Sequence, residues 1–91
     1  MRALDLLTKN DLRALRSALL TGKELVMERE WLPGNYRLRI TTKQADPIWG
    51  VHTIARVQTS RGSMESAQYI PTYGELYERL RGEVLPDEVH A

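Results

Sequence analysis

The segment from Glu24 to Lys43 alternates between two sets of side chains, and this alternation constrains the fold more than any other feature of the sequence. If the chain reverses at Pro33-Gly34 and Trp31 lies opposite Tyr36, the acids of the first run face the bases of the second. The expected pairs are Glu30 with Arg37, Glu28 with Arg39, and Glu24 with Lys43. The intervening positions then form a mostly apolar face. The segment therefore predicts a β-hairpin with one charged face and one face that packs on a core.

Two helices are predicted on either side of the strand region. The first begins at Thr8, a good N-cap residue, and ends at Gly22, because glycine is favoured just past a helix C-terminus. The residues just before Thr8 fit either a short strand or an additional helical turn. The second helix runs between Thr72 and Gly82, and Thr72 and Glu75 have the spacing of a capping box.

The remaining segments complete a small sheet. Residues 48–58 alternate as a third strand, residues 59–63 read as a turn, and residues 64–70 form a short fourth strand or none, since Ser66 and Gln68 dilute both faces. Hairpin-sized connections pair neighbouring strands. The sequence therefore predicts an α+β fold in which an antiparallel meander of three to four strands has two helices packed on one face, in the order α-β-β-β-(β)-α.

The length and composition favour a single small domain. The chain has 91 residues, of which 42% are apolar and 27% charged, values that are ordinary for a globular domain. We expect residues 1–83 to form one α+β domain and residues 84–91 an extended C-terminal tail. The chain contains no cysteine, and charged residues interrupt its apolar first twenty positions. We therefore expect a cytoplasmic protein without a membrane span.

The charge is unevenly distributed along the chain. Residues 1–61 carry eleven Lys/Arg and six Asp/Glu, whereas residues 62–91 carry two Lys/Arg and six Asp/Glu. The net charges of the two parts therefore have opposite signs, although the net charge of the whole chain is +1. The asymmetry fits a basic binding surface beside an acidic tail. It fits equally well two parts that attract each other in the fold.

The sequence shows no set of residues typical of catalysis. The two histidines, His52 and His90, are too few and too far apart for a zinc site, and the serines lie outside any G-x-S-x-G motif. We therefore expect no enzymatic activity, no metal and no cofactor. Arg29 is an exception to the apolar alternation, and we expect it to reach off the sheet edge or to stack on Trp31 or Tyr36.

The solvent-facing side of the sheet is the candidate binding surface. If the third strand lies beside the second, six basic or titratable side chains gather there and could engage phosphates or an acidic protein. These candidate partner-binding residues are Arg37, Arg39, Lys43, His52, Arg56 and Arg61. Nucleic-acid platforms also expose aromatic rings for stacking, whereas Trp31, Tyr36 and Trp49 are expected on the core side. The pattern favours a protein partner over RNA or DNA.

Two families resemble parts of the chain. The order of helix, three strands and helix resembles double-stranded RNA-binding domains, but these open their second helix with a lysine-rich run, and residues 71–75 contain no lysine. Gly22-Lys23 and Glu28-Arg29 are loosely similar to the Gly-x-Lys and Glu-x-Arg pattern of the ASCH group of RNA-associated domains, with the Glu and Arg adjacent here. We assign the chain to neither family.

These observations predict a non-catalytic binding module that docks stoichiometrically onto a protein partner. Small regulators or inhibitors, including those encoded by phages and mobile elements, have this profile. An RNA- or DNA-binding module that uses the basic sheet face is the alternative. An unpaired edge strand would also allow a homodimer.

Overall fold

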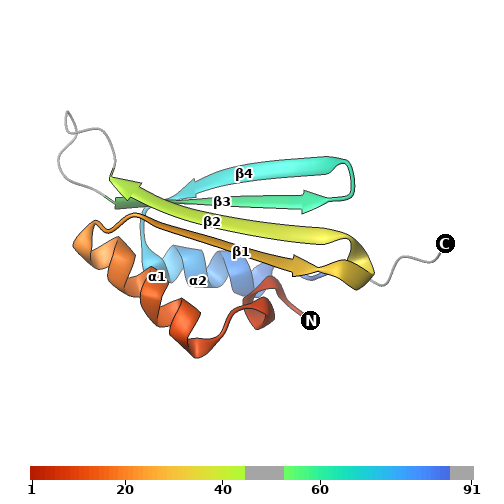
Figure 1. Cartoon of the computed structure of the whole chain (residues 1–91), viewed down its shortest axis with the longest axis horizontal. Helices are drawn as coiled ribbons and strands as arrows, with labels where there is room; N and C mark the ends of the chain where they lie inside the picture. The colour runs from red at the N-terminus through yellow and green to blue at the C-terminus, as the bar shows by residue number, and fades with distance from the viewer. Residues whose placement is uncertain (45–52, 87–91) are drawn as a thin grey trace.

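The computed structural model describes residues 1–44 and 53–86 (Figure 1). It shows the predicted α+β fold: four antiparallel strands lie in the sheet order β1-β2-β3-β4, with two helices on one side. The strands are β1 (Leu25–Trp31), β2 (Tyr36–Gln44), β3 (Thr53–Arg61) and β4 (Met64–Ile70), and the helices are α1 (Lys9–Thr21) and α2 (Tyr73–Gly82). The part of the predicted third strand before Thr53 lies outside the described residues.

The predicted register of the first hairpin is confirmed. Trp31 pairs with Tyr36, and the pairing continues without a slip to Leu25 and Thr42. A short 3-10 turn at Leu32–Gly34 reverses the chain, and Asn35 follows it with a φ of 51°. Asparagine tolerates this left-handed conformation better than most residues, so the turn sequence supports the register that the charges require.

The helix termini follow the expected local chemistry. The Thr8 hydroxyl accepts a hydrogen bond from the Asp11 amide, and the Asp11 carboxylate accepts one from the Thr8 amide, which forms a complete capping box. Gly22 ends α1 with a φ of 77°. At α2 the Thr72 hydroxyl accepts from the Glu75 amide, which is one half of the capping box that the sequence predicted. The residues before Thr8 form the 3-10 turn η1 (Ala3–Leu6), so the helical alternative is the observed one.

The core lies between the helices and one face of the sheet. The inward positions of β2 and β3 alternate with mostly exposed positions on β2 and half-buried positions on β3, and they pack against the apolar stripes of α1 and α2. The fully buried large side chains are Tyr36, Leu15, Leu38, Ile40, Leu76, Leu80 and Val57. In the described part of the chain no helix covers the other face of the sheet (Figure 1), and this uncovered face is the candidate binding surface. Among the described residues, no helix has the length and apolar character that crossing a bilayer requires.

The turn between β3 and β4 is shorter than the sequence predicted. We expected a turn over residues 59–63, but β3 continues to Arg61 and β4 begins at Met64, so only Gly62 and Ser63 form the loop. Gly62 has a φ of 61°, and glycine at the first position of a two-residue loop is typical of a type II′ hairpin turn. The polar residues that suggested a loop are strand residues, because their cross-strand partners compensate for their low strand preference. The fourth strand, which was optional in the prediction, is present.

The described residues after α2, 83–86, are extended and packed against the fold. The backbone of Val84 bridges to Arg2, and Leu85 is only 5% exposed. The Trp31 indole donates to the Pro86 carbonyl over 3.3 Å. A Cβ at Gly34 would lie 2.6 Å from the Pro86 ring, so the turn needs a glycine at this position. Leu85 therefore contributes to the core, and the domain boundary at residue 83 stays a prediction.

This packing predicts that Leu85→Ala destabilises the chain. The substitution empties a buried site, which typically costs about 2–5 kcal/mol in the free energy of unfolding. Val84→Ala is the matched control, because Val84 is adjacent but 52% exposed, and it should change stability by less than about 1 kcal/mol. Urea unfolding followed by circular dichroism measures both. Equal stability of the two variants would contradict the packing of this segment.

Candidate binding surface

We use the name open face for the side of the sheet that no helix covers. Its side chains occupy alternate positions on all four strands, in the register that the strand pairs define. They are Val26, Glu28 and Glu30 on β1; Arg37, Arg39, Thr41 and Lys43 on β2; Ile54, Arg56, Gln58 and Ser60 on β3; and Glu65, Ala67 and Tyr69 on β4. The open face thus combines both charges, neutral polar groups and apolar groups.

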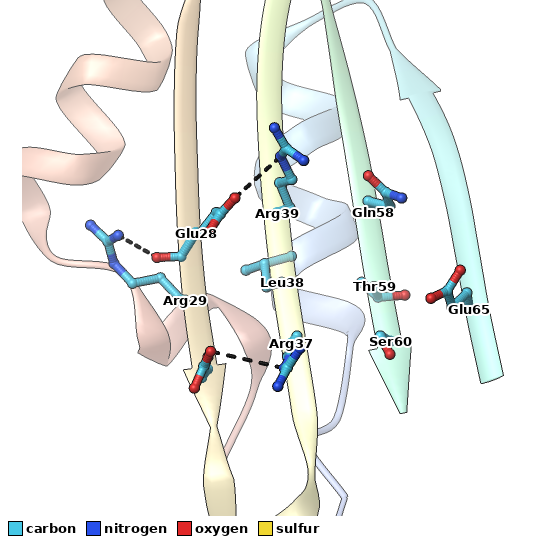
Figure 2. Close-up of a pocket in the computed structure, with 10 residues that line it drawn as sticks. Glu28, Arg29, Arg37, Leu38, Arg39, Gln58, Thr59, Ser60 and Glu65 are labelled. Atoms are coloured by element: carbon cyan, nitrogen blue, oxygen red, sulfur yellow. Dashed lines mark hydrogen bonds and ion pairs between the residues drawn. The ribbon is translucent and has the colours of Figure 1, made fainter. Parts of the chain in front are cut away.

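One end of the open face carries the cross-strand ion pairs. Figure 2 shows Glu28 reaching Arg39, with 3.4 Å between the carboxylate oxygen and Nε, and the corresponding distance from Glu30 to Arg37 is 3.9 Å. These side chains are all more than half exposed, so each pair contributes at most about 1 kcal/mol to stability. The third expected pair, Glu24 with Lys43, is not among the ion pairs of the described residues.

A hollow of about 230 Å³ lies over this charged end and extends across the sheet to Gln58, Ser60 and Glu65 (Figure 2). Pockets for small-molecule ligands typically measure about 300–1,000 Å³ and are mostly apolar. The hollow is smaller, and charged and amide side chains dominate its rim. It suits one or two protruding side chains of a macromolecular partner better than an enclosed small molecule.

The other end of the open face is less polar. Val26, Thr41, Arg56 and Tyr69 form one row across the four strands, which we call the Arg56 row. Val26 is 60% and Tyr69 56% exposed. Arg56 is half-buried between Thr41 and Tyr69, and its Nε atom is buried without a hydrogen-bond partner in the described part of the chain. The row therefore presents a cation beside an aromatic ring, with an aliphatic side chain at its far end.

The structure brings together four of the six predicted site residues. Arg37, Arg39, Lys43 and Arg56 all project from the open face. His52 lies outside the described residues. Among the residues that the structure describes, no group of three or more His, Cys, Asp and Glu side chains is placed to hold a metal ion.

The predicted placement of Arg61 on the open face is wrong. Because β3 extends through Arg61, this residue pairs with Tyr36 and shares its side of the sheet, opposite to Arg56. Its guanidinium lies 5.7 Å from the centre of the Tyr36 ring and donates to the Glu83 carboxylate and the Val84 carbonyl. Arg61 therefore joins β3 to the end of α2. Its ion pair with Glu83 also joins the basic part of the chain, residues 1–61, to the acidic part, residues 62–91.

Glu83 lies between two arginines at this junction. Arg61 and Arg79 contact its two carboxylate oxygens at 2.8 Å and 2.6 Å. Burial alone would raise the pKa of Glu83, but the hydrogen bonds and charges of Arg61 and Arg79 outweigh it and hold the pKa below the usual value of 4.5. Desolvation raises the pKa of the neighbouring Tyr36 phenol to about 12, and the charge of Glu83 adds to the effect. The hydroxyl is thus uncharged.

Arg29 occupies the helix side of the sheet edge, where the sequence placed it, and it reaches off that edge as expected. It donates to the Asp11 carboxylate over 2.8 Å and to the carbonyl of its neighbour Glu28 over 2.6 Å (Figure 2). The hydrogen bond from the Thr8 amide is the main cause that lowers the pKa of Asp11, and Arg29 adds to it. Arg29 therefore fastens β1 to the start of α1 and has a structural role.

Tyr69 is an open-face residue that sequence reasoning missed. The rings of Tyr73 and Tyr77 lie 6.2 Å apart on α2, whereas Tyr69 pairs with Arg56 and shares its side of the sheet. Its position follows from the two-residue loop at Gly62, which fixes the pairing of Arg56 with Tyr69. A type II′ interpretation of that loop would have placed Tyr69 correctly from the sequence.

Comparison with known proteins adds no assignment. No family model matches the chain, and neither the curated proteins nor the solved structures include a significant match. The function is therefore inferred from the residues of this chain.

The position of Glu83 predicts how stability depends on pH. Because its pKa is lowered in the folded state, the carboxylate stabilises the fold above the unfolded pKa, and this contribution is lost as the pH falls through the folded pKa. Glu83→Gln should lower the free energy of unfolding at neutral pH by about 1–3 kcal/mol. It should also make the loss of stability on acidification smaller than in the wild type.

Denaturant unfolding at neutral and acidic pH measures both effects. Glu78→Gln is the matched control, since its partner Arg81 is on the same helix and both side chains are exposed, so it should change stability by less than about 1 kcal/mol. An unchanged acid dependence in Glu83→Gln would show that the carboxylate does not stabilise this junction.

Proposed function

We propose that this chain is a non-catalytic binding module that docks onto a protein partner through the open face. The observation that carries the proposal is the Arg56 row, in which half-buried Arg56 lies directly beside exposed Tyr69, with Thr41 on its other side and exposed Val26 at the far end of the row. Arginine and tyrosine are enriched among the residues that contribute most to protein–protein binding. A partner that covers the row would bury the Tyr69 ring together with the arginine beside it.

The arrangement indicates the chemistry of the partner. The Arg56 row would receive a carboxylate flanked by apolar side chains, because desolvating the arginine is favourable only when an acid meets it. The charged end of the open face would lie at the rim of the interface, where exposed ion pairs contribute mainly to specificity and to the rate of association. The hollow near Gln58 and Glu65 would accept a protruding polar side chain.

The charge balance of the open face favours a protein over a nucleic acid. Four bases project from it, and three acids stand among them: Arg37, Arg39, Lys43 and Arg56 against Glu28, Glu30 and Glu65. Phosphate backbones require a clear excess of positive charge, since counterion release supplies most of the affinity. Tyr69 is the one aromatic residue of the described open face. Proteins that bind single-stranded nucleic acids usually offer several aromatic side chains on which successive bases stack.

The small scaffold and its single mixed face support a stoichiometric regulator or inhibitor, of the kind that phages and other mobile elements encode. A cysteine-free chain does not depend on an oxidising compartment, which supports a cytoplasmic site of action.

The proposal predicts that Arg56→Glu abolishes partner capture. The tagged chain is incubated with a cytoplasmic lysate, with and without nuclease, and the recovered proteins are identified by mass spectrometry. A protein recovered near one-to-one despite nuclease should bind Arg56→Glu at least roughly tenfold more weakly, because reversing a central arginine opposes the partner's acid.

Arg16→Glu is the matched control for this experiment. Arg16 is exposed on α1, on the side of the molecule away from the open face, and its reversal changes the net charge by the same amount. Thermal unfolding confirms that both variants are folded. Equal capture by the two variants would contradict docking through the open face, and a partner that disappears with nuclease treatment would move the function to RNA or DNA binding.

A further inference from the structure

The outer edge of β4 is the second surface that the fold leaves unexplained. β4 is the last strand of the sheet (Figure 1), and all of its residues except Ile70 are exposed. Its sequence, MESAQYI, contains one charged residue and no proline or lysine. Natural edge strands are usually protected by charges, prolines or bulges against pairing with another chain. β4 has almost none of these protections.

The opposite edge of the sheet provides an internal contrast. β1 carries three charged residues in succession, Glu28, Arg29 and Glu30. The guanidinium of Arg29 caps the carbonyl of Glu28 and also holds the Asp11 carboxylate at the start of α1. The chain therefore protects one edge of its sheet against strand addition and leaves the other available. In the described part of the chain no side chain bonds the outward backbone groups of β4.

The hairpin turn determines which backbone groups of β4 point outward. In a two-residue hairpin the residues that flank the loop, here Arg61 and Met64, form a hydrogen-bonded pair. Hydrogen-bonded and non-hydrogen-bonded pairs then alternate along the strands. The amides and carbonyls of Glu65, Ala67 and Tyr69 consequently face away from β3, toward the free edge.

These outward groups are arranged symmetrically about Ala67. If a second β4 lies antiparallel with Ala67 opposite Ala67, then Glu65 lies opposite Tyr69 in both directions, and each such pair exchanges two backbone hydrogen bonds. On the helix side Met64 then meets Ile70 and Ser66 meets Gln68. The single charge of the strand faces an aromatic ring, and no like charges oppose each other. In this register the outward backbone groups form hydrogen bonds, and no like charges meet on either face of the joined sheet.

We propose that two copies of this chain form a symmetric dimer by antiparallel pairing of their β4 strands about Ala67. Because paired residues on antiparallel strands point to the same side, the two open faces join into one continuous surface, and the helices of both copies lie on the other side. The dimer uses backbone groups at the edge rather than the open face, so it does not rest on the proposed function.

The oligomeric state of the full chain tests the proposal. Sedimentation equilibrium at increasing protein concentration should show a reversible dimer. Ala67→Pro should be monomeric, since it removes an outward amide while edge strands tolerate a proline whose nitrogen faces solvent. Ala67→Thr keeps the amide and should remain dimeric. A wild-type chain that stays monomeric, or a proline variant that dimerises as well as the threonine variant, would overturn the proposal.

Cysteine crosslinking tests the register in the otherwise cysteine-free chain. In the proposed dimer the two Ala67 positions are about 5.5 Å apart between Cα atoms, which is within the range that a disulfide spans. The two Tyr69 positions are roughly 14 Å apart, too far for a disulfide. Mild oxidation should therefore convert Ala67→Cys to a covalent dimer while Tyr69→Cys stays monomeric on denaturing gels. Equal crosslinking of both variants, or none of either, would refute this register.

Discussion

The cross-strand register between β1 and β2 decides which side chains can meet a partner. Seven successive pairs connect Leu25–Trp31 with Tyr36–Thr42, and every second pair faces the helices. A slip of one residue would place Glu28 opposite an apolar residue of β2, so that the charged side chains of one strand would face the core if the other strand kept its orientation. The exposed ion pairs are individually weak, but the cost of burying the charges of one strand excludes the alternative register. The open face exists because this register is fixed.

Much of the fold followed from local sequence patterns, because each pattern had a short-range physical cause. The capping residues defined α1, and the charge alternation defined the first hairpin. The placement of Arg61 failed for a specific reason: a run of Thr, Ser, Arg and Gly has the composition of a loop, and only the pairing with β2 and β4 makes it a strand. The burial of Leu85 depends on contacts with the opposite end of the chain, which no local pattern reveals.

The candidate surface likewise has some residues that local sequence patterns place and others that only the strand pairing places. The basic residues of β2 could be placed from the hairpin register alone. The full Arg56 row could not, because it also requires the pairing of β3 with β4, which the short turn at Gly62 sets. Arg56 was among the predicted residues, but Tyr69 was not. A binding surface assembled from one residue of each strand becomes visible only when the whole sheet is in register.

The sheet has three distinct boundaries: a face covered by helices, an open face that we propose meets a protein partner, and an edge that we propose pairs with a second copy. Nuclear magnetic resonance of the isotope-labelled chain, titrated with the partner that capture recovers, tests whether that partner meets the open face. We expect the largest chemical-shift changes at the Arg56 row and the neighbouring open-face positions, with the signals of α1 and α2 unaffected. Chemical-shift changes centred on the helices would contradict docking through the open face.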